Sequence, residues 1–223
     1  MNELARYIDH TLLKPTATEK QIENLCEEAI RYSFAAVCVN PYWVNFCAKK
    51  LSGTKVKVCS VVGFPLGATP TEVKAFETEF CLKNGAQEID MVINIGAVKD
   101  KNWCYVEKEI STLAKIAHSN NAILKVIFEN CLLEKDEIIK ACQVSIVANA
   151  DFVKTSTGFS TGGATFDDVK LMVETVKGKC KVKAAGGIRN AEDALNMIKI
   201  GAQRLGTSVG VAIVTGKNSS GGY

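Results

Sequence analysis

The sequence predicts a single-domain α/β protein, a (β/α)8 TIM barrel, and three observations support that fold class. Eight short β-rich runs alternate with longer stretches of helical composition along the chain. Several runs are nearly continuous in Val, Ile and Ala, as is typical of strands covered on both faces. The glycines that follow these runs are concentrated after the sixth, seventh and eighth, where such barrels commonly bind phosphate.

The expected strands, in order, are residues 7–13, 34–39, 55–62, 88–94, 123–129, 151–155, 181–185 and 203–207. Seven stretches between them have helical length and composition, among them residues 19–32, 71–84, 103–120 and 191–200. Polar caps with acidic first turns open such stretches, and glycine follows their ends, as at Gly85 and Gly201. A last helix must fit within about residues 209–216. No repeat or linker divides the chain, so we expect one catalytic barrel domain over residues 1–215 and a flexible tail over residues 216–223.

An open, doubly wound parallel sheet is the competing architecture. That fold would favour a Gly-x-Gly-x-x-Gly turn after the first strand, and no such motif follows residues 7–13. The late glycines therefore favour the barrel.

Composition and charge narrow the function classes. The chain has 223 residues, 47% of them hydrophobic, and a net charge of +3, which excludes a disordered or collagen-like protein. The basic run at residues 176–183 is interpreted as a solvated turn rather than a nucleic-acid patch. Nine cysteines without C-x-x-C spacing fit a reducing compartment, and neither a signal peptide nor a membrane-spanning run is evident. We expect a cytoplasmic protein with no nucleic-acid or membrane partner.

Charged residues within the apolar runs are the most informative feature. They are Asp9, Asp90, Lys125, Lys154 and Lys183. An inward-facing charge in a barrel carries a desolvation cost, so these residues either form structural ion pairs, point outward between helices, or perform chemistry. We expect them near strand ends that are followed by loops, where barrel enzymes place catalytic groups.

Imine formation is the chemistry that requires such a set. A lysine attacks a carbonyl only as the free amine, and burial or a second cation nearby favours that form. The pattern predicts Lys154 as the nucleophile and Lys183, on the next strand, as the neighbouring cation. Asp90 is the expected proton relay, with Asp9 and Lys125 in supporting positions. Glycine-rich loops after three successive strands, at residues 155–158, 185–189 and 205–208, predict a phosphate cradle.

A metal-dependent aldolase is the alternative mechanism, and the histidine inventory disfavours it. Only His10 and His118 are present, and His118 falls in an expected helix, whereas catalytic zinc normally takes three protein ligands. We therefore expect no metal and no other cofactor.

Five segments resemble the deoxyribose-phosphate aldolase family of class I aldolases: residues 8–15, 61–67, 88–94, 152–159 and 182–189. The resemblance implies reversible cleavage of 2-deoxy-D-ribose 5-phosphate to D-glyceraldehyde 3-phosphate and acetaldehyde, in deoxynucleoside catabolism. It implies Lys154 as the Schiff-base lysine, Lys183 as its partner and Asp90 as the relay. It also implies a homodimer or homotetramer, and an auxiliary role for the terminal Tyr223. The implied phosphate ligands are Gly158, Gly186, Gly187, Gly206 and Ser208.

Two departures from the family pattern are visible, Asn130-Cys131 after Glu129 and Leu205 in the last strand, and neither is at an implied catalytic position. Two other functions stay open from the residues: a transaldolase-like lyase acting on another sugar phosphate, and a catalytically silent phosphate binder. The combination of Lys154, Lys183 and Asp90 disfavours the binder, because binding alone requires no activated lysine.

Overall fold

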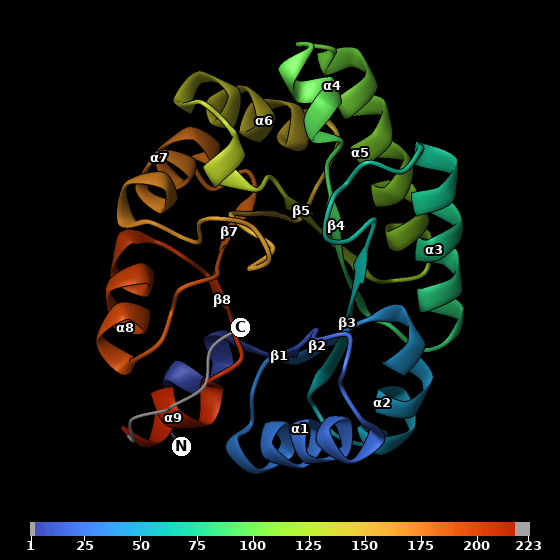
Figure 1. Cartoon of the computed structure of the whole chain (residues 1–223), viewed down its shortest axis with the longest axis vertical. Coiled ribbons are helices and arrows are strands. Elements are labelled where there is room, and N and C mark those ends of the chain that lie inside the picture. The colour runs from blue at the N-terminus through green and yellow to red at the C-terminus, as the bar shows by residue number, and fades with distance from the viewer. Residues whose placement is uncertain (1–2, 217–223) are drawn as a thin grey trace.

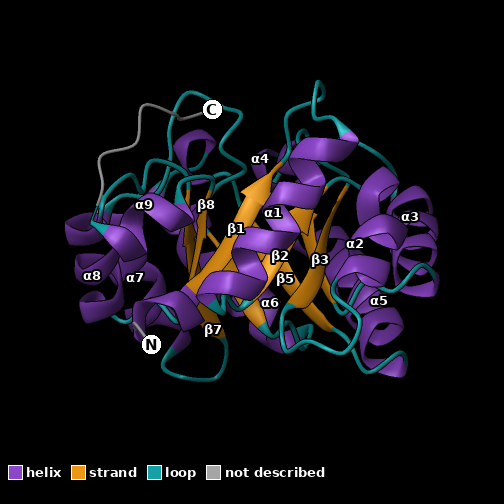
Figure 2. Ribbon diagram, turned by 90° about the horizontal axis from the view of Figure 1, so that it is seen from below, coloured by secondary structure: helices purple, strands orange, loops and turns teal. Residues whose placement is uncertain are grey.

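Eight parallel strands close into a barrel in sequential order, and β8 pairs back with β1 in the computed structural model. The structure describes residues 3–216. Helices surround the strands as an outer ring, which Figure 1 shows along the barrel axis and Figure 2 from the side. The predicted barrel is confirmed, and the open doubly wound sheet is excluded.

The strands are β1 (Ile8–Leu12), β2 (Ala36–Val39), β3 (Lys57–Val62), β4 (Glu88–Val92), β5 (Ile123–Ile127), β6 (Phe152–Lys154), β7 (Lys181–Ala185) and β8 (Arg204–Thr207). The α-helices are α1 (Glu19–Tyr32), α2 (Val44–Lys50), α3 (Thr71–Lys83), α4 (Ile95–Lys99), α5 (Trp103–Ser119), α6 (Lys135–Val147), α7 (Phe166–Val176), α8 (Ala191–Ile200) and α9 (Gly210–Thr215). Three 3₁₀ turns span Glu3–Tyr7, Pro41–Trp43 and Asn130–Leu132.

The expected helices at residues 19–32 and 191–200 match α1 and α8, whereas several expected strands were too long at their ends. Tyr7 closes a 3₁₀ turn instead of opening β1. Asn94 lies beyond β4 because its side chain accepts a hydrogen bond of 3.1 Å from the Ala97 amide and caps α4, a short helix that was not expected. Glu129 lies beyond the end of β5, and its backbone has a left-handed conformation with φ of 57°.

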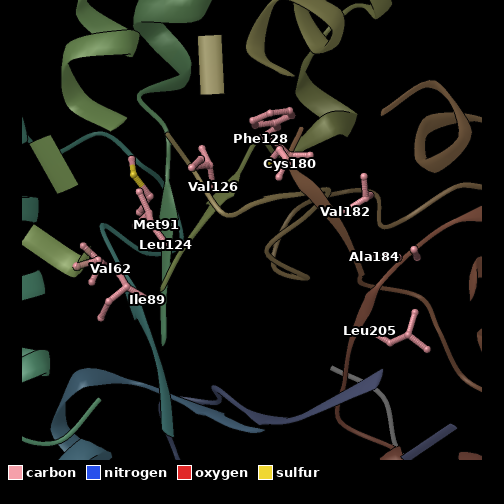
Figure 3. Close-up of a cluster of buried hydrophobic side chains, with 14 of the residues drawn as sticks. Val62, Ile89, Met91, Leu124, Val126, Phe128, Cys180, Val182, Ala184 and Leu205 are labelled. Atoms are coloured by element: carbon pink, nitrogen blue, oxygen red, sulfur yellow. The ribbon is translucent and has the colours of Figure 1, made fainter. Parts of the chain in front are cut away.

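Alternation along each strand separates two environments. Residues that flank the charged positions belong to the apolar layer between barrel and helices. Figure 3 shows two of them, Ile89 and Met91, which precede and follow Asp90 in the sequence. Val182 and Ala184 flank Lys183 in the same way. Because neighbouring side chains of a strand point to opposite faces, the charged positions face the barrel interior.

The barrel interior is divided between charge and apolar surface. Its apolar part is a small buried cluster supplied by β2, β3 and the residue that follows β1. The cluster consists of Leu13, Ala36, Cys38, Cys59 and Val61, with Phe64 packed against it. Strands β4 to β8, together with Asp9 of β1, supply the charged part. Within residues 3–216, no helix has both the length and the apolar character needed to cross a bilayer.

Candidate active site

Asp90 lies at the centre of a buried charged network inside the barrel. Its Oδ2 accepts hydrogen bonds of 2.7 Å from the amines of both Lys154 and Lys183. Its Oδ1 accepts a hydrogen bond of 2.7 Å from the Lys125 amine. The three lysines project from adjacent strands β5, β6 and β7. Lys154 pairs in register with Lys183, whereas Lys125 lies beside Phe152, two residues before Lys154, and joins them through Asp90.

Asp9 extends this network on the opposite side. It is fully buried and accepts a hydrogen bond from the Lys183 amine. Its other oxygen accepts a bond of 2.6 Å from the Arg204 guanidinium, which also lies 2.9 Å from Glu88 Oε2. Glu88 in turn pairs with Lys125 at 2.6 Å. The structure therefore brings together the five charged residues that the sequence singled out.

Glu88 and Arg204 belong to the same network and were missed by the sequence-based selection. Both fall inside expected strands, at residues 88–94 and 203–207, so the rule that selected Asp90 also applies to them. The signal was available, because each is separated by an even number of residues from an inward-facing position, Asp90 and Gly206 respectively.

The expectation that these charges lie near strand ends was wrong for most of them. Lys154 is the last residue of β6, but Asp90, Lys125 and Lys183 are each the central residue of a five-residue strand. Mutual ion pairing compensates their desolvation, so the strands can carry them deep in the barrel. The outward-pointing alternative is also excluded, because the amines of Lys125, Lys154 and Lys183 all donate to Asp90 inside the barrel.

Electrostatics fix the charge state of the groups around Lys154. Burial alone would raise the pKa of Asp90, but the charges of Lys125, Lys154 and Lys183 hold it well below its ordinary value. Burial opposes the charged form of Lys183, but Asp9 and Asp90 outweigh it and raise the pKa of Lys183. Asp90 is therefore a carboxylate and Lys183 an ammonium at neutral pH.

The network contains more basic groups than acidic ones. Lys125, Lys154, Lys183 and Arg204 are opposed by Asp9, Glu88 and Asp90. If every group were ionised, the buried network would carry an excess positive charge, which is costly in a low-dielectric interior. Release of one proton removes the excess. Lys154 differs from the other two lysines in position and contacts. It is the last residue of β6 and pairs with one carboxylate, while Lys125 and Lys183 contact two or more each.

A cavity of about 280 Å³ lies where β6, β7 and β8 end. All five implied phosphate ligands line it: Gly158, Gly186, Gly187, Gly206 and Ser208. Arg189, which was not singled out, also lines the cavity and brings a positive charge to it. Its place in the Gly186-Gly187-Ile188-Arg189 segment was the available signal. Backbone amides in such loops, together with a guanidinium, form a suitable environment for a phosphate group.

Close backbone packing explains two of the glycines in these loops. A Cβ on Gly163 would lie 2.6 Å from the carbonyl carbon and oxygen of Gly186. Gly186 itself has φ of +83°, which disfavours any side chain. The loop after β6 therefore rests directly on the backbone of the loop after β7, and the cavity wall depends on both.

Glu129 holds the loop after β6 by two hydrogen bonds to Thr157. Its Oε1 accepts a hydrogen bond of 3.2 Å from the Thr157 amide, and its Oε2 accepts one from the Thr157 hydroxyl. Burial is the main cause of a raised pKa at Glu129. The loop that carries Gly158 is thus fixed to the end of β5.

Cys38, Cys59 and Asp90 offer ligand atoms within 4.8 Å of one another, close enough to hold a metal ion. However, Asp90 is already bound by three lysine amines, and a further cation would be repelled by them. Tyr223, the remaining candidate, lies outside the described residues.

Comparison with known proteins agrees with this geometry. A family model described as DeoC/LacD family aldolase matches residues 4–219. Deoxyribose-phosphate aldolase of Streptococcus gordonii is 58% identical over 221 residues, which is 99% of this chain and 100% of that protein.

Solved structures show the same likeness. A putative deoxyribose-phosphate aldolase from Coccidioides immitis superposes with a TM-score of 0.93 at 44% identity, covering 96% of this chain and 85% of that one. The deoxyribose phosphate aldolase of Aeropyrum pernix, described as a unique tetramer, gives a TM-score of 0.89 at 38% identity, covering 95% and 89%. The chain belongs to the DeoC/LacD aldolase family.

Proposed function

We propose that this protein is a deoxyribose-phosphate aldolase that cleaves 2-deoxy-D-ribose 5-phosphate reversibly to D-glyceraldehyde 3-phosphate and acetaldehyde, in deoxynucleoside catabolism. The observation that carries the proposal is the hydrogen bonding of Lys154 and Lys183 to one oxygen of Asp90, beside a glycine-lined cavity. Relatives of this name cover the full chain at 55–58% identity.

Imine formation is the first step of the proposed reaction. The neutral amine of Lys154 attacks C1 of the open-chain aldehyde, and the C1 oxygen takes up a proton to give a carbinolamine. Loss of water, assisted by proton transfer through Asp90, gives the protonated imine. Lys183 stays an ammonium throughout, because Asp9 and Asp90 stabilise its charge.

Carbon–carbon cleavage follows from the imine. Removal of the C3 hydroxyl proton allows the C2–C3 bond to break, and its electron pair moves into the iminium to form an enamine on Lys154. D-Glyceraldehyde 3-phosphate leaves from the cavity, where the glycine loops and Arg189 hold its phosphate. Protonation of the enamine at C2 and hydrolysis of the resulting imine release acetaldehyde and restore the lysine.

The test is turnover of purified protein with deoxyribose 5-phosphate, with acetaldehyde and glyceraldehyde 3-phosphate measured separately. The proposal requires equimolar release of both in the presence of a metal chelator. A transaldolase-like lyase would instead transfer a ketose fragment such as dihydroxyacetone and release no acetaldehyde. A silent phosphate binder would bind the sugar phosphate without releasing either product.

The protein is also proposed to form a homodimer or homotetramer. Exposed apolar residues on one face of α3, Val73, Phe76 and Phe80, support contact with a second copy, since such a stripe is unusual on a free surface. Light scattering should give a mass above one chain, and Phe76→Glu should lower it. We further infer a cytoplasmic location, because all nine cysteines are free, five of them fully buried.

A further inference from the structure

Cys59 is a buried thiol that lies inside the charged network rather than in the outer apolar layer. It belongs to β3, where it pairs in register with Cys38 of β2 and Glu88 of β4. Its side chain therefore faces the barrel interior, in the small apolar cluster that borders the charged residues. None of the proposed catalytic steps uses it.

Two hydrogen bonds connect Cys59 to the relay carboxylate. Its Sγ donates to Asp90 Oδ1 at 3.1 Å, and the amine of Lys125 donates to the same sulfur at 3.3 Å. Lys125 also donates to Asp90 Oδ1 at 2.7 Å, so thiol, amine and carboxylate oxygen form a closed triangle.

The two oxygens of Asp90 consequently have different tasks. Oδ1 is held by Cys59 and Lys125, and neither of these is a proposed reacting group. Oδ2 faces Lys154 and Lys183. When Lys154 becomes an imine, Asp90 Oδ2 loses one of its two ammonium partners and keeps Lys183. The contacts at Oδ1 then carry a larger share in fixing the orientation of the carboxylate.

Cys59 remains a proton donor in this environment. Burial, followed by its hydrogen bond with Cys38, raises the pKa of the Cys59 thiol well above its ordinary value. The group is therefore S–H at neutral pH and can donate to the carboxylate.

We propose that Cys59 is a positioning residue, whose thiol holds Asp90 Oδ1 so that Oδ2 stays directed at Lys154 and draws less strongly on its proton. This inference rests on the proposed Schiff-base function. A carboxylate that accepts a hydrogen bond from Cys59 has less charge to offer an ammonium at Lys154, so the free amine forms at lower pH.

Serine and alanine at position 59 provide a matched pair. Their side chains are both smaller than cysteine and leave a similar void, but only serine retains a donor to Asp90. Cys59→Val removes the donor while filling the space, and it substitutes for Cys59→Ala if that variant does not fold. Cys142, a fully buried thiol on α6, gives a control for loss of a buried cysteine elsewhere.

The measurement is the pH dependence of kcat/KM for deoxyribose 5-phosphate, with folding checked by circular dichroism. Cys59→Ala should move the acid limb of the profile upward by about half a pH unit, since a weak hydrogen bond to a charged acceptor is exchanged for none. Cys59→Ser should restore the acid limb to that of the parent protein or below it. Cys142→Ala should leave the profile unchanged.

Borohydride trapping with acetaldehyde separates the two levels of the proposal. If the parent protein gives no adduct at Lys154, the Schiff-base function itself fails. If the parent is trapped normally and the alanine, valine and serine variants all keep the pH profile of the parent, only the positioning role of Cys59 is overturned. Equal shifts in the alanine and serine variants would likewise overturn it, because packing rather than the donor would then be responsible.

Discussion

Two buried lysines, Lys74 outside the strands of the barrel and Lys154 inside them, differ in the features that we propose separate a structural lysine from a reactive one. Lys74 of α3 lies in the outer layer and is fully buried; its amine donates to Glu109 at 2.7 Å and to the Val92 carbonyl at 2.8 Å. Lys154 lies in the inner network, at the end of β6, and donates to Asp90 at 2.7 Å.

The difference lies in charge balance and access rather than in burial. Lys74 and Glu109 form one cation with one anion, and Glu109 also accepts a hydrogen bond from the Asn94 amide at 3.0 Å. In the inner network four basic groups share three carboxylates, and glycine loops open a cavity beside it. The balanced pair joins α3 and α5 to β4, whereas we propose that the unbalanced set provides one amine as a nucleophile.

Removal of the proposed nucleophile should have the largest effect. Lys154→Ala deletes the amine on which the imine forms, and kcat/KM should fall at least about a thousandfold, as expected for loss of a covalent nucleophile. Steady-state assay with deoxyribose 5-phosphate measures this. Lys74→Met, a lysine removed from the balanced pair, should keep kcat within about twofold. Similar losses in both variants would contradict the distinction.

Loss of Asp90, the proposed relay carboxylate, should have the second-largest effect. Asp90→Asn removes the group that faces Lys154 and Lys183 and should lower kcat by about a hundredfold or more, the usual range for general acid–base groups. Asp9→Asn removes an equally buried charge that contacts Lys183 and Arg204 instead. It should cost distinctly less in kcat at pH 7, and a greater loss at Asp9 would reverse the assigned roles.

A change in the cavity wall should act on binding rather than on chemistry. Gly163→Ala places a methyl group against the Gly186 backbone and should separate the two loops. KM for deoxyribose 5-phosphate should rise about tenfold or more, since hydrogen bonds to a charged group are each worth about 1.5–3 kcal/mol. Turnover of unphosphorylated 2-deoxyribose should change much less. Equal losses with both substrates would place the phosphate elsewhere.

The ion pair of Lys74 with Glu109 should contribute to the free energy of unfolding. Lys74→Met leaves Glu109 buried without its cation and should lower the free energy of unfolding by about 3 kcal/mol. Urea unfolding measures this. Replacing both partners, Lys74→Met with Glu109→Leu, should recover much of the loss because no unpaired charge remains. If the separate losses of Lys74→Met and Glu109→Leu simply add in the double variant, the two side chains do not compensate each other and the pairing is contradicted.

The sequence predicted the barrel, its strand order and the inclusion of five charged residues in the site. All three depend on local patterns: apolar runs, glycine placement and charge within strands. Side-chain alternation could also have identified Glu88 and Arg204. The balance of four basic groups against three acidic ones could not be predicted, because it depends on contacts across the barrel between residues as distant as Asp9 and Arg204. Lys74 lay within an expected helix, where a charged residue carries no sign of burial.

We propose that Lys154, alone among the buried lysines, forms an imine. Sodium borohydride reduction in the presence of acetaldehyde, followed by peptide mass spectrometry, locates the modified residue. We expect one reduced acetaldehyde adduct per chain, located on Lys154, with parallel loss of deoxyribose 5-phosphate cleavage. An adduct at Lys183, Lys125 or Lys74, together with full activity of Lys154→Ala, would contradict it.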